Sequence, residues 1–314
     1  MYWGVYVRHY WKVMLGSKSS AAQACRTGGF LGADYDIDQD LTGSLPETYR
    51  EFNAEWIPYF LQSRDSRVSA GLAAGQLWTV CRGIAVGDVV LSPTGTPGEL
   101  QVGEVTGEYY YAPEGPLPHR RPVTWRPTTL HKETMSSDLR SGLGYGATVC
   151  SLDKYSDELA ALLRIDPPPI ITSTDPDVED PSVFALEQHL EDFLIANWPQ
   201  TDLAQRYRIF EEDGQITGKQ YMTDTGPLDI LALSHDGSEL LVIELKRGRA
   251  SDRVVGQIQR YMGFVKDVLA EPHQAVRGII IALEDDPGLR RALSVASGIE
   301  FYRYKVSFQL EKVT

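Results

Sequence analysis

GPLDILALSHDGSELLVIELKRG, residues 226–248, carries the clearest structural pattern in the C-terminal half of this 314-residue chain. It contains two apolar runs, residues 228–233 and 240–245, on either side of a short polar break. The Asp236-Gly237 pair in this break is the strongest two-residue hairpin signal. We therefore expect an antiparallel hairpin whose register is set by a turn at these two residues.

Two acids and a lysine stand at the far end of this predicted hairpin. The register places Asp229 opposite Glu244, and Lys246 follows two residues later on the same face. Both faces are otherwise apolar, as in central strands that are covered on two sides. Like charges opposite one another repel, so we expect a cation between the carboxylates, and oxygen ligands favour Mg²⁺ or Mn²⁺. The alternative is a strand-end salt bridge to Lys246 and Arg247.

An aspartate, a hairpin and then Glu-Leu-Lys resembles the PD-(D/E)XK nuclease superfamily. The longer pattern LDILAL…LLVIELKRG…VVGQIQRYMGFVK is similar to its mismatch-endonuclease branch. Leu228 replaces the proline of the family motif, and Pro227 stands one place earlier. The resemblance covers about residues 183–304. It implies an α/β restriction-endonuclease-like fold with a mixed central sheet and a Mg²⁺- or Mn²⁺-dependent endodeoxyribonuclease activity.

The resemblance also implies roles for single residues of the hairpin and the first helix. Asp229 and Glu244, with the carbonyl of Leu245, are expected to hold the metal, and Lys246 to orient the attacking water. The helix expected over residues 182–196 carries Glu187, the acid that the first core helix of the superfamily supplies. Glu191 lies one turn further along the same side of the helix, and for it a solvent-facing position is nearly as well supported as a place in the site.

A second helix, expected over residues 254–270, completes the catalytic set. Gln257 shares a face with Tyr261, and the resemblance implies that it positions the nucleophile or the lysine. Gly256 and Gly263 are expected to allow close packing of this helix. The basic residues expected to contact the DNA backbone are Arg120, Arg121, Arg247, Arg249, Arg253 and Arg260.

The N-terminal half alternates short strand and helix signals. Strands are expected within residues 4–15, 87–93, 101–112 and 122–125. Helical periodicity is expected over residues 46–61 and 69–80, with shorter helices at 20–26 and 152–163. Several short strands with inserted helices predict a small curled α+β barrel.

The order of these elements resembles the PUA-like barrels, especially their EVE and YTH branch. It runs from a first strand through the turn 16–19 and a short helix to GDVV, VGEVTG and HRRPVTW, over about residues 8–127. In those families a pocket stacks one flipped or modified base between aromatic rings. The residues expected to line it are Ser17, Phe30, Tyr35, Trp78, Tyr109, Tyr111 and His119. Core packing is the alternative for each ring taken singly.

Composition and the distribution of prolines indicate how the chain is divided into domains. Residues 166–181 contain five prolines and five acids, which predicts a linker between domains at 1–165 and 182–314. No apolar run is long enough to span a membrane, and the N-terminus lacks a signal-peptide pattern, so we expect a cytoplasmic protein. Cys25, Cys81 and Cys150 are isolated, which argues against a zinc site or a disulfide framework. The net charge of −13 predicts weak DNA binding without a specific target.

The two resemblances together predict a modification-dependent restriction endonuclease. The barrel would read a modified base in double-stranded DNA, such as a 5-substituted cytosine, and recruit the nuclease in defence against foreign DNA. Cleavage of both strands by a single-site nuclease suggests a homodimer. One alternative is a mismatch or branched-DNA repair endonuclease, in which the barrel only aids binding. The other is a non-catalytic nucleic-acid binding protein, for which RNA remains open.

Overall fold

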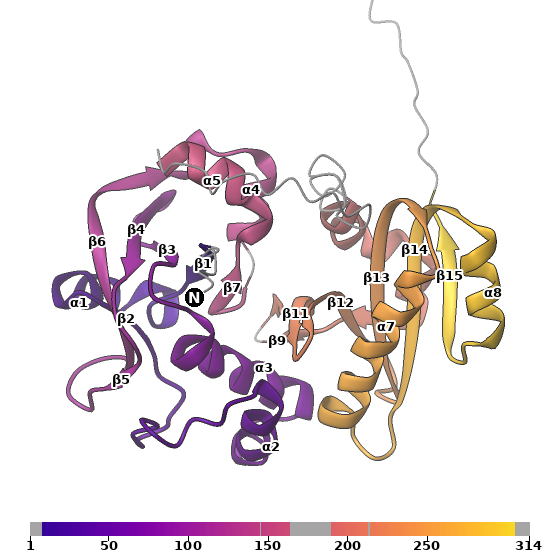
Figure 1. The fold of residues 1–314 in the computed structure, drawn as a ribbon, viewed down its shortest axis with the longest axis horizontal. Helices are drawn as coiled ribbons and strands as arrows, with labels where there is room; N and C mark the ends of the chain where they lie inside the picture. The colour runs from indigo at the N-terminus through magenta and orange to yellow at the C-terminus, as the bar shows by residue number, and fades with distance from the viewer. Residues whose placement is uncertain (1–7, 145, 164–189, 213, 305–314) are drawn as a thin grey trace, which may run out of the picture. The chain divides into compact units, whose positions relative to one another are not determined.

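The computed structural model describes residues 8–144, 146–163, 190–212 and 214–304. Its contacts divide the chain into two compact units, Met1–Val178 and Glu179–Thr314, which are taken separately below (Figure 1). The predicted linker, Glu187 and the first half of the helix expected over residues 182–196 lie outside the described residues.

The N-terminal unit is built on a curled seven-stranded sheet in the order β2-β6-β4-β3-β1-β7, with β5 paired to β6. β1 and β3 are parallel, and the other pairs are antiparallel. The strands are β1 (Tyr10–Val13), β2 (Phe30–Ala33), β3 (Val89–Pro93), β4 (Glu99–Val105), β5 (Tyr110–Tyr111), β6 (His119–His131) and β7 (Val149–Ser151). The expected curled sheet with inserted helices is therefore present.

Helices and short turns are inserted between these strands. They are α1 (Ala22–Gly28), α2 (Tyr49–Phe60), α3 (Arg67–Trp78), α4 (Ser137–Leu143) and α5 (Ser156–Leu163), with turns η1 (Ser17–Ser19), η2 (Thr79–Gly83), η3 (Lys132–Thr134) and η4 (Asp153–Tyr155). The two longest begin where side chains cap them. Thr48 and Glu51 form a capping box on α2, and Ser66 caps α3.

Alternation along the strands gives this sheet two hydrophobic faces. Trp11, Val13 and Leu15 pack in one cluster with residues of α1 and β2, which confirms the predicted shared face. Tyr10 and its neighbours on β3 and β4 pack in a second cluster with α4 and α5. Each strand of the centre is therefore covered on both sides.

The C-terminal unit contains a mixed sheet in the order β11-β12-β13-β14-β15, and β8 also pairs with β12. The strands are β8 (Tyr207–Ile209), β9 (Glu211–Glu212), β10 (Gln215–Ile216), β11 (Lys219–Thr223), β12 (Gly226–Ser234), β13 (Glu239–Ala250), β14 (Ala275–Asp285) and β15 (Ile299–Arg303). β12 and β13 form the predicted antiparallel hairpin, with Leu231 opposite Val242. β14 runs parallel to β13, and β15 runs parallel to β14.

Helices cover this sheet. They are α7 (Arg253–Phe264) and α8 (Pro287–Val295), with turns η5 (Trp198–Gln200), η6 (Asp202–Gln205) and η7 (Val265–Leu269), and residues 190–196 are also helical. Leu190 and Leu194 pack on the cluster that contains Leu241, Ile243 and Leu245. Figure 1 shows α7 lying along β13 and β14, which it contacts.

The close approach of α7 to the sheet is at a strand glycine, which corrects the expectation for Gly256 and Gly263. A Cβ at Gly278 of β14 would lie 2.6 Å from the Met262 sulfur and 3.0 Å from a methyl of Ile258. A Cβ at Gly263 would meet nothing within 4 Å. The small residue that this interface needs is therefore on β14 and not on the helix.

No helix in the described ranges is long and apolar enough to cross a membrane.

Candidate functional site

The central hairpin brings Asp229, Glu244 and Lys246 together. Asp229 precedes and Glu244 follows the paired residues Ile230 and Ile243, so the two acids occupy the next step of the ladder. The Glu244 side chain is almost fully buried, and Lys246 Nζ lies 3.4 Å from its Oε1. Asp229 Oδ2 accepts a 2.8 Å hydrogen bond from the backbone N–H of Leu245. The site therefore contains two acids and one ammonium on adjacent central strands.

A third acid, Glu191, joins this group from the helical residues 190–196. It is 3% exposed, so the possibility of a solvent-facing glutamate is wrong. Gln220 Nε2 on β11 donates to both Glu191 carboxylate oxygens and to Asp229 Oδ1, each at 3.1 Å. Glu187, the acid expected from the sequence, lies outside the described residues. Within the described part of this helix, Glu191 is therefore the acid that reaches Asp229 through Gln220.

Gln220 is a site residue that sequence reasoning missed. β11 pairs with β12 through Lys219 opposite Ile230 and Tyr221 opposite Leu228, so Gln220 stands opposite Asp229. In the sequence, Gln220 is a polar residue between Lys219 and Tyr221, which are both buried. This pattern could indicate a site residue only if the register between β11 and β12 were already known.

Helix α7 contributes Gln257 and Tyr261, as their shared face predicted. Burial raises the pKa of Tyr261, and a hydrogen bond with Gln257 opposes that shift. The charges of Glu244 and Asp229 also raise this pKa. Tyr261 is buried, and its helix contacts β13, the strand that carries Glu244 and Lys246.

The oxygen donors of this site suit a hard divalent cation. Asp229, Glu244 and the Leu245 carbonyl supply two carboxylates and one carbonyl, a small set of the kind that Mg²⁺ uses while keeping several waters. In the part of the chain that the structure describes, no three or more His, Cys, Asp or Glu side chains form a metal-binding group. The fit therefore rests on the two strand acids and the carbonyl, as the sequence suggested.

Two of the expected DNA-backbone contacts are corrected. Arg120 is 9% exposed and donates to the carbonyls of Glu114, Pro116 and Leu117, so it holds that loop. Arg121 is 2% exposed and donates to the Cys81 carbonyl and to Glu108. Buried guanidiniums that already bind protein acceptors cannot contact phosphates.

The other basic candidates lie in the C-terminal unit. Arg249 is exposed and pairs at 3.5 Å with Glu284, and Arg253 and Arg260 are exposed on α7. Nothing is described for the Arg247 side chain. Exposed positions on β13 and α7, next to the acid group, remain available to a phosphate backbone.

Three residues of the expected base pocket do gather, but as part of the fold. His119 is fully buried between Tyr109 and Tyr111, with ring centroids 6.0 and 5.4 Å away. Its Nε2 donates to the Ile37 carbonyl, and Tyr109 donates to its Nδ1. Phe30 is buried under the guanidinium of Arg120 at 4.1 Å. Core packing, the alternative for each ring, therefore holds for His119 and Phe30.

The remaining expected pocket residues are dispersed. Tyr35 donates to Gln76, and Trp78 packs against Phe52. Ser17 is exposed on the turn η1.

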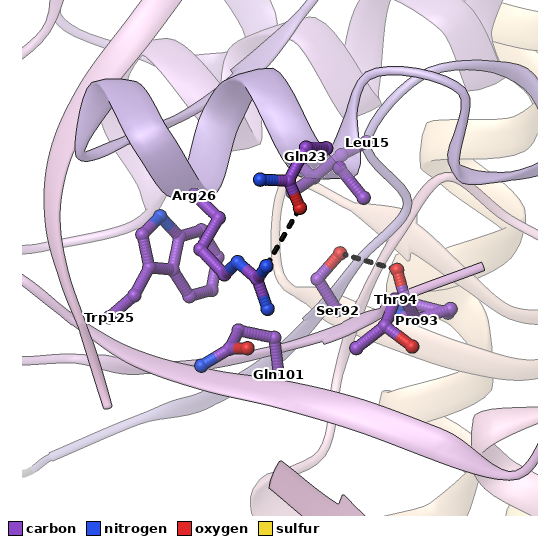
Figure 2. Close-up of a pocket in the computed structure, with 9 residues that line it drawn as sticks. Leu15, Gln23, Arg26, Ser92, Pro93, Thr94, Gln101 and Trp125 are labelled. Carbon is purple, nitrogen blue, oxygen red and sulfur yellow. Dashed lines mark hydrogen bonds between the residues drawn. The ribbon is translucent and has the colours of Figure 1, made fainter. Parts of the chain in front are cut away.

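A small pocket of other residues lies between α1 and the strands β3, β4 and β6. Figure 2 shows Arg26 and Trp125 on one side of it, with Ser92 and Gln101 opposite. The Trp125 indole N–H donates to the Cys25 carbonyl, and Arg26 donates to Gln23. None of the seven expected pocket residues lines it. No periodic pattern in the sequence indicates this pocket, because its walls come from five separate segments.

In comparisons with known proteins, the two halves of the chain match different families. Residues 189–310 match the family described as the Endonuclease NucS C-terminal domain. Residues 11–143 match a domain of unknown function (DUF8426). The acid group described above lies within the first of these matches.

Individual relatives are endonucleases of the same name. The chain is 24% identical over 182 residues to Endonuclease NucS of Pyrococcus abyssi, covering 58% of this chain and 63% of that protein. It is 28% identical over 186 residues to Endonuclease NucS of Aeropyrum pernix, covering 58% and 62%. The chain thus spans slightly less than two thirds of each relative. A crystal structure of a repair endonuclease from Pyrococcus abyssi overlaps 41% of this chain and 48% of that one, with 23% identity and a TM-score of 0.30.

Proposed function

We propose that this chain is a divalent-metal-dependent DNA endonuclease whose C-terminal unit hydrolyses phosphodiester bonds. The observation that carries the proposal is that Glu191 and Glu244 are buried, that Gln220 connects Glu191 to the half-buried Asp229, and that Lys246 lies beside Glu244. Burying carboxylates is costly unless a cation compensates their charge, and a divalent ion between Asp229 and Glu244 would supply that compensation. The match to an endonuclease family over the same residues supports it.

The side chains divide the work. Asp229, Glu244 and the Leu245 carbonyl would hold Mg²⁺ or Mn²⁺, which when bound polarises the scissile phosphate and lowers the pKa of an attacking water. Lys246 carries its positive charge to the edge of the acid group, where it stabilises negative charge that develops on the phosphate. Helix α7, which contacts β13 and buries Tyr261, would limit the access of bulk water from its side.

The first candidate for the substrate is mismatched or branched DNA, in a repair role. It is supported by the family match of the C-terminal unit and by relatives named Endonuclease NucS. In this role the N-terminal unit adds binding surface, and a homodimer brings one acid group to each strand.

The second candidate is DNA that carries a modified base, in a defence role. The observation that favours it is the separate N-terminal unit, whose sequence matches a different domain from that of the nuclease half. Its curled sheet with inserted helices supports a PUA-like barrel. The half-buried Trp125 beside Arg26 offers a flat ring and a donor, the two groups that base recognition needs (Figure 2).

One cleavage experiment separates these candidates. Duplexes of one sequence are incubated with Mg²⁺ or Mn²⁺ in perfectly paired, mispaired, branched, 5-methylcytosine, 5-hydroxymethylcytosine, glucosylated and N6-methyladenine forms, beside an RNA duplex. We expect selective cutting of the mispaired or branched DNA. Selective cutting of one modified duplex would establish the second candidate instead, and cutting of none would remove the endonuclease proposal.

Three variants control this experiment. Asp229→Asn and Lys246→Ala should lower the cleavage rate at least ~10²-fold, because the first removes a carboxylate that would hold the metal and the second removes a positive charge that stabilises the phosphate in the transition state. Lys266→Ala removes an exposed lysine at the end of α7 and should cut like the wild type. Cleavage by Asp229→Asn at the wild-type rate would contradict the assigned site.

A further inference from the structure

Gln220 has a backbone conformation that its residue type avoids. Its φ is +47°, in the left-handed region, although it lies inside the strand β11. Residues other than glycine rarely adopt this region, because the Cβ then crowds the backbone, and such strain is kept where the surrounding structure imposes it. The position therefore has a constraint beyond strand formation.

The side chain of Gln220 connects two acids from different elements. Its Nε2 lies 3.1 Å from each Glu191 carboxylate oxygen and 3.1 Å from Asp229 Oδ1. An amide nitrogen has two hydrogens, so at least one of them is shared among the three acceptors. The partial positive charge of the amide thus offsets the repulsion between a helix carboxylate and a strand carboxylate.

The neighbouring residue makes a second contact to the same helical segment. Lys219 is 6% exposed and donates to Asp192, so two consecutive strand residues reach two consecutive helix residues. In a regular strand, consecutive side chains point to opposite faces. The left-handed backbone at Gln220 breaks this alternation, and both side chains can then meet the helix.

We infer that Gln220 is a positioning residue, which holds Asp229, one of the proposed ligands of a divalent ion, at a fixed separation from Glu191. Resting on the proposed endonuclease function, this inference adds that the strained backbone is kept because it aims the amide between the two acids. Gln220 acts through the acids and does not itself bind the ion. Such supporting hydrogen bonds orient metal ligands, and their loss lowers metal affinity or activity by roughly 10–100-fold.

A purely structural role makes the opposite prediction for one variant. Gln220→Gly removes the amide but accepts the left-handed backbone without strain. If Gln220 only fastens the helix, this variant loses stability and keeps its affinity for the metal ion. If Gln220 positions the acids, the variant keeps its stability and loses affinity.

The test uses the full chain with Mn²⁺ as the probe. Isothermal titration calorimetry without DNA measures Mn²⁺ affinity, and thermal unfolding without metal measures stability. For Gln220→Gly we expect an unfolding midpoint within a few degrees of the wild type and a roughly 10–100-fold weaker Mn²⁺ affinity. Gln220→Asn keeps a shorter amide and tolerates the left-handed region. Its Mn²⁺ affinity should therefore lie between that of the wild type and that of Gln220→Gly.

Gln274→Leu is the matched control. Gln274 Nε2 also donates to an acceptor of the hairpin, the Gly237 carbonyl, but at the turn and away from the acids. This variant should bind Mn²⁺ like the wild type. Wild-type Mn²⁺ affinity in Gln220→Gly would overturn the inference, as would a weakening of the same size in Gln274→Leu.

The outcomes for Gln220 and for the enzyme are distinguishable. A wild type that binds Mn²⁺ but cuts none of the nucleic acids removes the proposed function, and the calorimetric comparison still decides the role of Gln220. A wild type that cuts DNA beside a Gln220→Gly variant with the same Mn²⁺ dependence removes only the inference. A wild type that does not bind Mn²⁺ overturns both.

Discussion

His119 illustrates how burial fixes the chemistry of one side chain. Its Nε2 faces the Ile37 carbonyl, which only accepts, so Nε2 carries the proton of the neutral ring. Nδ1 then accepts from the Tyr109 hydroxyl, which itself accepts from the Leu41 N–H. A second ring proton has no acceptor in this chain of bonds. Burial accordingly lowers the pKa of His119.

We predict that His119 makes the N-terminal unit less stable at mildly acidic pH. Because the folded-state pKa is lowered, the unfolded chain binds more protons below its pKa of about 6.5, and the free energy of unfolding falls as the pH falls from 7 toward 5. This residue can contribute a slope of up to about 1.4 kcal/mol per pH unit. Urea unfolding followed by tryptophan fluorescence at several pH values measures it.

His119→Gln is the comparison for this prediction. Glutamine offers an amide donor and a carbonyl acceptor but has no proton to gain in this range. The pH dependence of the variant should be shallower than that of the wild type, while the other histidines contribute equally to both. Parallel profiles between pH 7 and 5 would show that His119 titrates normally.

At the scale of elements, the contact between α7 and β14 sets the position of the helix that carries Gln257 and Tyr261. Gly278 leaves room for Met262 and Ile258 to pack against the sheet. The same helix carries Gln257 and Tyr261, which directly precede Ile258 and Met262 in the sequence. A change in the separation of this helix and the sheet therefore moves Gln257 and Tyr261.

We predict opposite effects for two glycine-to-alanine changes at this interface. Gly278→Ala inserts a methyl 2.6 Å from the Met262 sulfur and should lower the free energy of unfolding by about 1–3 kcal/mol. Gly263→Ala fills open space on α7 and should raise it by about 0.5–1 kcal/mol, because alanine favours the helix. Chemical denaturation of both variants measures the two signs, and stabilisation by Gly278→Ala would refute the close contact.

At the scale of the molecule, each unit has hydrophobic clusters of its own. The N-terminal clusters lie on the two faces of its curled sheet, and the C-terminal cluster lies under the helical residues 190–196. The acid group belongs entirely to the C-terminal unit. A metal ion bound by these acids should therefore act on the local stability of that unit.

We predict that Mn²⁺ slows amide hydrogen exchange in β12, β13 and residues 190–196. A ligand at ten times its dissociation constant stabilises the bound state by about 1.4 kcal/mol, which corresponds to roughly tenfold slower exchange through unfolding of this unit. Exchange followed by mass spectrometry locates the effect, and Asp229→Asn should abolish it. Protection confined to peptides of the N-terminal unit would place the metal elsewhere.

The hairpin, its register and the meeting of Asp229, Glu244 and Lys246 could be predicted from local sequence patterns. This is possible because a two-residue turn and the alternation of strand side chains are local, and they set which residues face each other within 20 positions. The sequence also predicted the helix face that Gln257 and Tyr261 share, since helical spacing is equally local.

Long-range packing, by contrast, sets which further side chains lie in the predicted sites and which are buried elsewhere. Glu191 becomes a buried partner of Asp229 through Gln220, and Gln220 itself is placed by the pairing of β11 with β12. Arg121 and His119 are withdrawn into the core by contacts to residues 40 and 82 positions away. These outcomes depend on how distant segments pack, and no local period in the sequence encodes that packing.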